Sequence, residues 1–113
     1  MKRFAGFLLV AVFMFGARVG SAVERPLAST LKFVYPVGTG DFVLGFDMDS
    51  PQCLASGSPK YMYVAVGQNG VTTDGAKKMF AAAMMAFALG KQISIAFDDG
   101  TVFCYINRLS VSN

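Results

Sequence analysis

The alternation of hydrophobic and polar positions is clearest over residues 92–97, where isoleucine or phenylalanine occupies every second position of QISIAF. A period of two is that of a half-buried strand. The turn DDG at 98–100 follows, and residues 101–111 are again rich in strand-forming side chains, so the pattern predicts a hairpin. Within its second strand, Asn107 and Arg108 indicate a bulge or a bend.

Three apolar segments earlier in the chain predict further strands: 30–37, 41–48 and 60–66. The glycine-rich turn at 38–40 joins the first two, and Pro36 and Gly45 indicate a sheet edge or a bulge. Residues 49–59 have turn composition throughout, so we expect a loop held by Cys53. The predicted order is three strands, a helix and two or three further strands, which is a mainly β (α+β) chain.

The one predicted helix lies between the third and fourth strands. Thr72 or Thr73 can cap its start, and Asp74 stands in its first turn. Gly90 follows its last apolar residue, where helices usually end. Residues 79–89 contain no polar side chain at any angle, so the helix is expected to be covered on more than one side. Because a small domain offers it only one sheet, we expect a second copy or a partner to cover the other side.

The spacing of the apolar residues predicts which side of this helix packs on the sheet and which side faces other subunits. Phe80, Met84 and Phe87, at positions i, i+4 and i+7, are expected to pack on the sheet. The smaller residues Ala82 and Ala86 are expected to face other subunits, together with Met79 or Met85. Light scattering would then detect a closed oligomer.

The amino-terminal segment 1–22 is typical of a secretory signal. Two basic residues precede an apolar run at 4–15, and small residues precede a cut that we predict between Ala22 and Val23. The run is shorter than the roughly twenty apolar residues of a membrane span, so no span is expected after cleavage. An uncleaved membrane anchor is the alternative. The sequence therefore predicts a secreted or periplasmic protein with one domain, 23–113.

Removal of the signal changes the charge of the chain. The whole sequence has ten basic and seven acidic residues, and three of the basic ones lie in the signal, so the mature chain is near neutral. No basic stripe remains that would support binding of nucleic acid. With no histidine, a serine or cysteine hydrolase lacks its usual base. The adjacent acids Asp98 and Asp99 have the pattern of an ordinary turn. We therefore predict a non-enzymatic protein with no catalytic residues, metal or cofactor.

The two cysteines, Cys53 and Cys104, are expected to form an intramolecular disulfide in an oxidising compartment. The alternatives are an intermolecular bridge, a reactive thiol or a metal site. A metal site is disfavoured because the chain has no imidazole ligand.

Residues 61–111 as a unit have a recognisable pattern: a polar loop, a helix DGAKKMFAAAMMAFALGK, a strand QISIAFD and a cysteine-bearing strand FCYINRLSV. This pattern resembles that of small secreted proteins related to the binding subunit of subtilase cytotoxin and to pertussis-like toxin B subunits. In that family a helix ending in Gly-Lys or Gly-Gln leads directly into an alternating strand, as Gly90-Lys91 leads into 92–97 here.

The resemblance implies a small OB-like barrel of five strands, with one helix between strands three and four. It also implies a ring of five copies with the helices lining its centre, and a possible catalytic toxin A subunit as partner. In the family the ring binds sialylated or related glycans, and a serine near the start of the first strand contacts the sugar. Ser29 is the residue in a comparable place.

These features together predict an exported binding protein that recognises a glycan on a cell surface, or a protein ligand, as a ring oligomer. The alternative is an envelope or periplasmic protein of structural or inhibitory type that binds no glycan. Tyrosines are candidate stacking surfaces for sugars or bases, although tyrosine is also common in strands: Tyr35, Tyr61, Tyr63 and Tyr105.

Overall fold

The computed structural model describes residues 22–113, and the predicted signal at 1–22, apart from its last residue, lies outside the described residues. The described chain is mainly β, with five antiparallel strands in one sheet and one helix, as predicted. In chain order the elements are β1 (Glu24–Pro36), β2 (Phe42–Phe46), β3 (Met62–Val64), α2 (Thr73–Leu89), β4 (Gln92–Asp98) and β5 (Ile106–Ser112).

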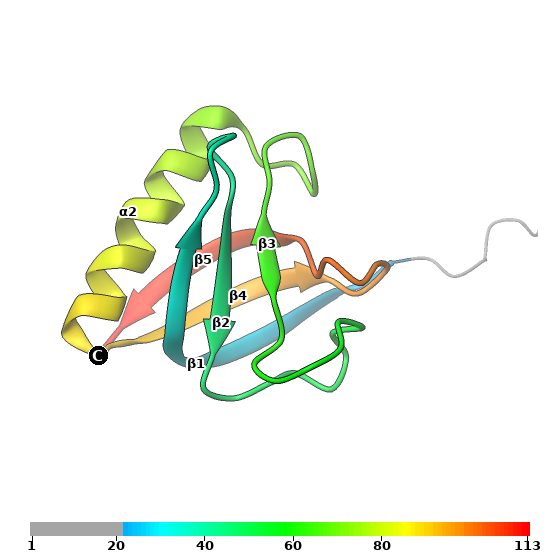
Figure 1. Cartoon of the computed structure of the whole chain (residues 1–113), viewed down its shortest axis with the longest axis horizontal. Helices are drawn as coiled ribbons and strands as arrows, with labels where there is room; N and C mark the ends of the chain where they lie inside the picture. Colours follow the sequence, from blue (N-terminus) through cyan, green and yellow to red (C-terminus); the bar gives the residue numbers. More distant parts are fainter. Residues whose placement is uncertain (1–21) are drawn as a thin grey trace, which may run out of the picture.

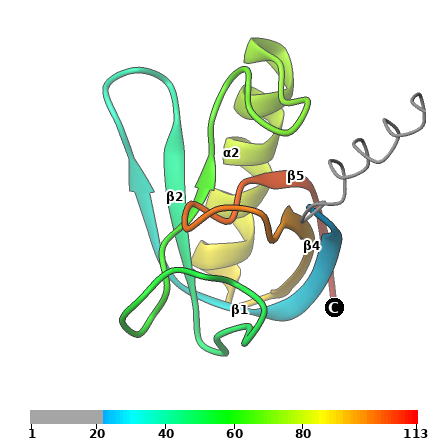
Figure 2. The same ribbon diagram turned by 90° about the vertical axis from the view of Figure 1, so that its right-hand side faces the viewer.

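Strand β1 stands at the centre of the sheet, whose order is β3-β2-β1-β4-β5. The first half of β1 pairs with β4, and its second half pairs with β2. Between Leu31 and Phe33 the register shifts, so that Lys32 is an extra residue that bends the strand. Figure 2 shows this bend, which turns the two halves of the sheet toward each other.

The sheet formed by residues 22–113 is curved but not closed into a barrel, because β3 and β5 share no ladder. A single backbone hydrogen bond, from the N–H of Tyr63 to the carbonyl oxygen of Phe103 (3.1 Å), spans the gap beside β3. The five strands with a helix after the third are thus confirmed, whereas the closed OB-like barrel stays a prediction.

Two strand boundaries differ from the prediction. The first strand begins at Glu24 rather than Thr30, and it tolerates Pro26 because this half of β1 pairs only with β4. The last strand begins at Ile106, because Cys104 has a left-handed backbone (φ 46°) that interrupts extended structure. The predicted bulge in this strand is confirmed, since Asn107 is an extra residue between the pairs formed with β4.

The core lies between the inner face of the sheet and α2, which runs along one side of the strands (Figure 1). The large, fully buried side chains come mainly from the strands: Phe42, Leu44, Phe46, Met62, Val64, Ile93, Phe97 and Ile106. Burying each one stabilises the fold by about 1.5–3 kcal/mol. The predicted helix ends are also confirmed, because the Thr72 side chain accepts the N–H of Gly75 and Gly90 has a left-handed backbone.

The predicted directions of the helix residues were partly wrong. Ala86, which was expected to face another subunit, is fully buried, and Met79 packs partly against the core. Met84 and Phe87, which were expected to pack on the sheet, are 41% and 43% exposed. The reason is size: small side chains let the helix backbone approach the sheet closely, and bulkier residues lie at the flanks. The buried residues of α2 are accordingly Ala76, Ala83 and Ala86.

Over residues 81–89, the helix surface that faces solvent is apolar. It includes Met85 and Leu89, together with the exposed Met84 and Phe87, while Phe80 and Ala82 are half-buried. Within residues 22–113, no helix has the length and apolar character needed to cross a membrane.

The predicted disulfide between Cys53 and Cys104 is confirmed, with a Cα–Cα distance of 5.7 Å. Both residues are buried, and neither is a free thiol. The bridge connects the loop after β2 to the segment before β5, and these are 51 residues apart in the chain. It therefore links the two ends of the open sheet.

Candidate functional site: an aromatic face

The outer face of β1, β2 and β3 carries large aromatic side chains. Phe33 in β1 lies opposite Gly45 in β2, and its ring extends across this glycine to meet Tyr61 beside β3, with ring centroids 5.2 Å apart. A Cβ atom on Gly45 would lie 2.1 Å from the Phe33 ring. Gly45 therefore leaves the space in which an aromatic ring crosses β2.

Val43 occupies the neighbouring position on the same face, between Tyr35 of β1 and Tyr63 of β3. It is buried, yet it does not belong to the core cluster beneath the sheet. Side chains on the outer face must therefore cover it. Tyr35 packs edge-on against Tyr61, with ring centroids 6.3 Å apart, which closes the group above the β2 backbone.

A second group of rings continues this surface toward the disulfide. Phe103 packs edge-on against Tyr63 at 5.4 Å and stacks on Tyr105 at 5.3 Å. The hydroxyl of Thr101 accepts the N–H of Phe103 at 3.2 Å, which holds the segment before β5 in place. We call the combined surface the aromatic face: Phe33, Tyr35, Tyr61, Tyr63, Phe103 and Tyr105.

Three members of the aromatic face are open to solvent: Tyr35, Tyr61 and Phe103 are 53%, 44% and 43% exposed. The other three are half-buried. The four tyrosines that the sequence offered as stacking candidates thus lie on one face. The two phenylalanines were missed. The signal for Phe33 was its position two residues before Tyr35, since alternate residues of a strand share a face.

The charged residues that flank the aromatic face are engaged in local contacts. Lys32 lies 3.7 Å from Asp47, and the Lys60 ammonium donates to the carbonyl oxygens of Ser50 (2.8 Å) and Cys53 (2.7 Å). Asp49 accepts hydrogen bonds from the Ser58 hydroxyl and the Lys60 backbone N–H, and these hold the pKa of Asp49 below its usual value.

Ser29, the residue implied as a sugar contact, is 93% buried on the inner side of β1. Its hydroxyl donates to the carbonyl oxygen of Thr30 (2.9 Å) and accepts the N–H of Met48 (3.1 Å). Its one proton is therefore used inside the protein. In this structure Ser29 holds β1 against the start of the loop after β2, and it lies apart from the aromatic face.

The outer face of β1, β4 and β5 has a different character. It contains a shallow depression of about 380 Å³, with small side chains such as Ser94, Ala96 and Ser110 in its lining. At its margin, Arg108 lies 3.9 Å from Glu24, and both side chains are substantially exposed. This surface offers neither stacked rings nor a buried polar group.

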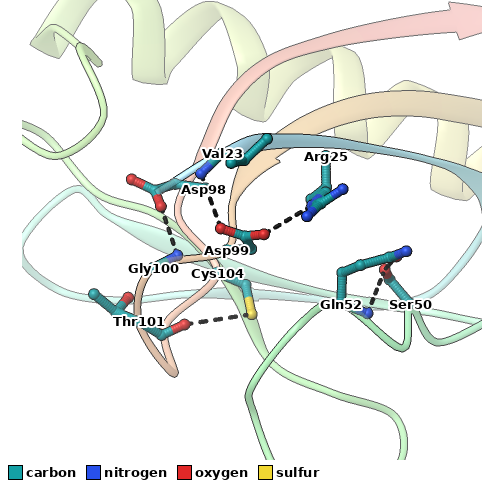
Figure 3. Close-up of polar contacts among 9 residues, drawn as sticks. All are labelled: Val23, Arg25, Ser50, Gln52, Asp98, Asp99, Gly100, Thr101 and Cys104. Carbon is teal, nitrogen blue, oxygen red and sulfur yellow. Dashed lines mark hydrogen bonds and ion pairs between the residues drawn. The ribbon is translucent and has the colours of Figure 1, made fainter. Parts of the chain in front are cut away.

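The adjacent acids Asp98 and Asp99 have separate structural contacts (Figure 3). Asp98 accepts the N–H of Gly100 at 2.7 Å. Asp99 accepts the Arg25 guanidinium at 2.7 Å and the N–H of Val23 at 2.9 Å, and the bond from Arg25 is the main reason that the pKa of Asp99 is lowered. The two carboxylates thus organise a turn. Among residues 22–113, no group of three or more metal-ligating side chains converges.

Comparisons with protein-family models, with curated proteins and with solved structures found no match. Function is therefore inferred from the residues of this chain, and the aromatic face is the surface with the most specific chemistry.

Proposed function

We propose that this protein is an exported, non-enzymatic binding protein that recognises glycans through its aromatic face. The observation that carries the proposal is the group of six rings on one side of the sheet, of which Tyr35, Tyr61 and Phe103 are open to solvent. The negatively polarised face of an aromatic ring attracts the C–H groups on the apolar side of a sugar. Tyrosine hydroxyls add hydrogen bonds to the sugar hydroxyls.

The rigidity of this surface supports the same function. All six rings contact another ring of the face. Strands β1 and β3 hold three of them, and the disulfide anchors the segment that carries Phe103. A surface that is ordered before binding loses little conformational entropy when a ligand arrives.

The strand order supports an OB-like arrangement as the finer description of the fold. In OB folds, five strands form a partly open barrel, and the face of strands two and three with the loop between strands four and five binds oligosaccharides or oligonucleotides. Here Tyr61 and Tyr63 lie beside and in β3, and Phe103 and Tyr105 lie between β4 and β5, while Phe33 and Tyr35 extend the face onto β1. This likeness of fold agrees with the proposed kinship to toxin B subunits, although fold alone does not determine function.

We also propose that the exported chain forms a homo-oligomer through α2, a ring of five being the form that the B-subunit resemblance implies, with a toxin A subunit as a possible partner. Support comes from the exposed apolar side chains of Met84, Met85, Phe87 and Leu89. Light scattering tests this, with Met85→Glu as the disrupting variant, because Met85 is exposed and the domain should still fold. A wild-type monomer at tens of micromolar would contradict the oligomer.

The test of glycan binding is a glycan array probed with the mature chain 23–113. We expect binding that Tyr61→Ala abolishes, while Arg108→Ala, on the other half of the sheet, has no effect. Circular dichroism should show that both variants remain folded. A folded wild-type protein that binds no glycan would support the alternative, a structural or inhibitory envelope protein.

A further inference from the structure

We propose that the part of the ligand in contact with the aromatic face is an uncharged sugar, with no carboxylate, sulfate or phosphate. This inference rests on the proposed glycan-binding function and specifies its substrate class. It departs from the sialylated glycans that the toxin-subunit resemblance implies.

The first argument is the chemistry of the face itself. Its members are two phenylalanines and four tyrosines, so its polar atoms are phenol hydroxyls. A phenol hydroxyl is one donor and one acceptor and brings no cationic group to the face. Neutral hydroxyls form ordinary hydrogen bonds with sugar hydroxyls, whereas tight recognition of an anion uses a guanidinium, an ammonium or a set of backbone N–H groups.

The second argument is the state of the neighbouring cations. Lys32 precedes Phe33 and lies beside Asp47, while Lys60 precedes Tyr61 and has its ammonium on two backbone carbonyl oxygens. If Lys60 turned toward an anionic ligand, the carbonyls of the loop after β2 would lose their partner. Binding a carboxylate through Lys60 would therefore leave two carbonyl oxygens without their donor, which is costly. The exposed Lys32–Asp47 pair contributes little, so Lys32 is the cation that the experiment has to test.

The third argument is the sign of the charge around the face. The strands and the loop that carry it are flanked by the acids Asp41, Asp47 and Asp49 and by the two lysines Lys32 and Lys60. Asp41 accepts the N–H of Val66 at 3.0 Å, and Asp49 is held ionised by its hydrogen bonds. The surroundings thus carry a slight excess of negative charge, which favours a neutral ligand over an anionic one.

The experiment compares matched glycans that differ only in charge. Mature protein is tested against immobilised native serum glycoprotein and against the same glycoprotein after enzymatic removal of sialic acid, at 50 and 300 mM NaCl. We expect at least tenfold tighter binding to the desialylated form, with less than a twofold change between the two salt concentrations. Tyr61→Ala should weaken this binding at least tenfold, and Phe103→Ser provides a second variant on the other ring group.

Lys32→Ala is the decisive control, because it removes the exposed cation nearest to the face in sequence. Unchanged affinity in this variant supports the inference. Tighter binding to the sialylated form, lost in Lys32→Ala or Tyr61→Ala, would overturn the neutral-sugar inference but leave the glycan-binding function in place. Binding to neither form, nor to any sugar on the array, would overturn both, as would binding that neither Tyr61→Ala nor Phe103→Ser weakens.

Discussion

The outer face of the curved sheet has two halves that share strand β1 but differ in the size of their side chains. The half formed by β1, β2 and β3 carries the aromatic face. The half formed by β1, β4 and β5 carries mainly small residues at the corresponding positions: Pro26, Ala28, Ser94, Ala96 and Ser110. The extra residue Lys32 separates the two halves within one strand.

The comparison shows that the pattern which predicts a strand does not reveal whether the outer face of that strand can bind a ligand. Both halves bury apolar residues on the inner face, and both have the period of two. Only the outer residues distinguish them, and in the aromatic half these residues are themselves hydrophobic. Residues 33–35 and 61–63 therefore resemble a strand buried on both sides, although Tyr35 and Tyr61 are exposed.

The largest expected effect comes from breaking the covalent connection between the two halves. The Cys53–Cys104 bridge closes a loop of about fifty residues, and replacing both cysteines by alanine should lower the free energy of unfolding by about 4 kcal/mol. Urea denaturation of the oxidised wild type, the reduced wild type and the double variant measures this. Equal midpoints for all three would show that the bridge adds no stability.

A smaller effect is expected from closing the space over Gly45. A methyl group there would collide with the Phe33 ring, so Gly45→Ala should destabilise the domain by about 1–3 kcal/mol and change the near-ultraviolet circular dichroism of the aromatic face. In the variant Gly45→Ala with Phe33→Leu, part of this loss should be recovered. Ser94→Ala on the other half is the matched control. An unchanged aromatic signal in Gly45→Ala would contradict the described crossing.

Acid should lower the stability of each half of the sheet by protonating one carboxylate, which is Asp49 in the aromatic half and Asp99 in the other. Both have a pKa below the usual value of 3.8, so their contribution is present above that value and is lost as pH falls through the lowered pKa. The stability of the wild type should therefore fall below about pH 4. Asp49→Asn and Asp99→Asn should each show a shallower decline in acid denaturation experiments. A decline as steep as in the wild type would exclude that residue as a contributor.

The smallest effect on stability is expected for Tyr35→Phe. This change removes one hydroxyl from an exposed ring, and the free energy of unfolding should stay within about 0.5 kcal/mol of the wild type. Thermal denaturation measures it. A loss as large as that of Gly45→Ala would mean that the hydroxyl is part of the fold rather than free for a ligand.

Much of the fold could be predicted from local signals. The helix has a threonine cap and a terminal glycine, the strand over 92–97 alternates cleanly, and two cysteines allow one intramolecular pairing. The bulge at Asn107 was also visible as a polar interruption. These features depend on residues close in sequence or on simple counting, and the structure confirms them.

The errors arose where distant segments decide the outcome. The side of α2 that packs on the sheet depends on how closely the helix backbone approaches the strands. The close approach buries the small Ala86 and leaves Met84 exposed. The aromatic face depends on the pairing that sets Gly45 beside Phe33, which the sequence alone does not reveal. The sugar contact of Ser29 stays a prediction, and the structure shows that its side chain is buried and bonded to the backbone of Met48.

The contact between Val23 and Asp99 bears on the predicted export and processing of the chain. The N–H of Val23 donates to the Asp99 carboxylate, and the N–H of Asp99 donates to the carbonyl oxygen of Val23, so the predicted cleavage site borders a docked strand. Proteases favour exposed, flexible segments, and we therefore expect the cut to precede folding of β1. Once the cut is made, the nitrogen of Val23 becomes a charged amino terminus. Cleavage would then give Asp99 a second cationic partner beside Arg25. The new amino terminus would thereby strengthen the contact that holds the start of β1 against the turn after β4.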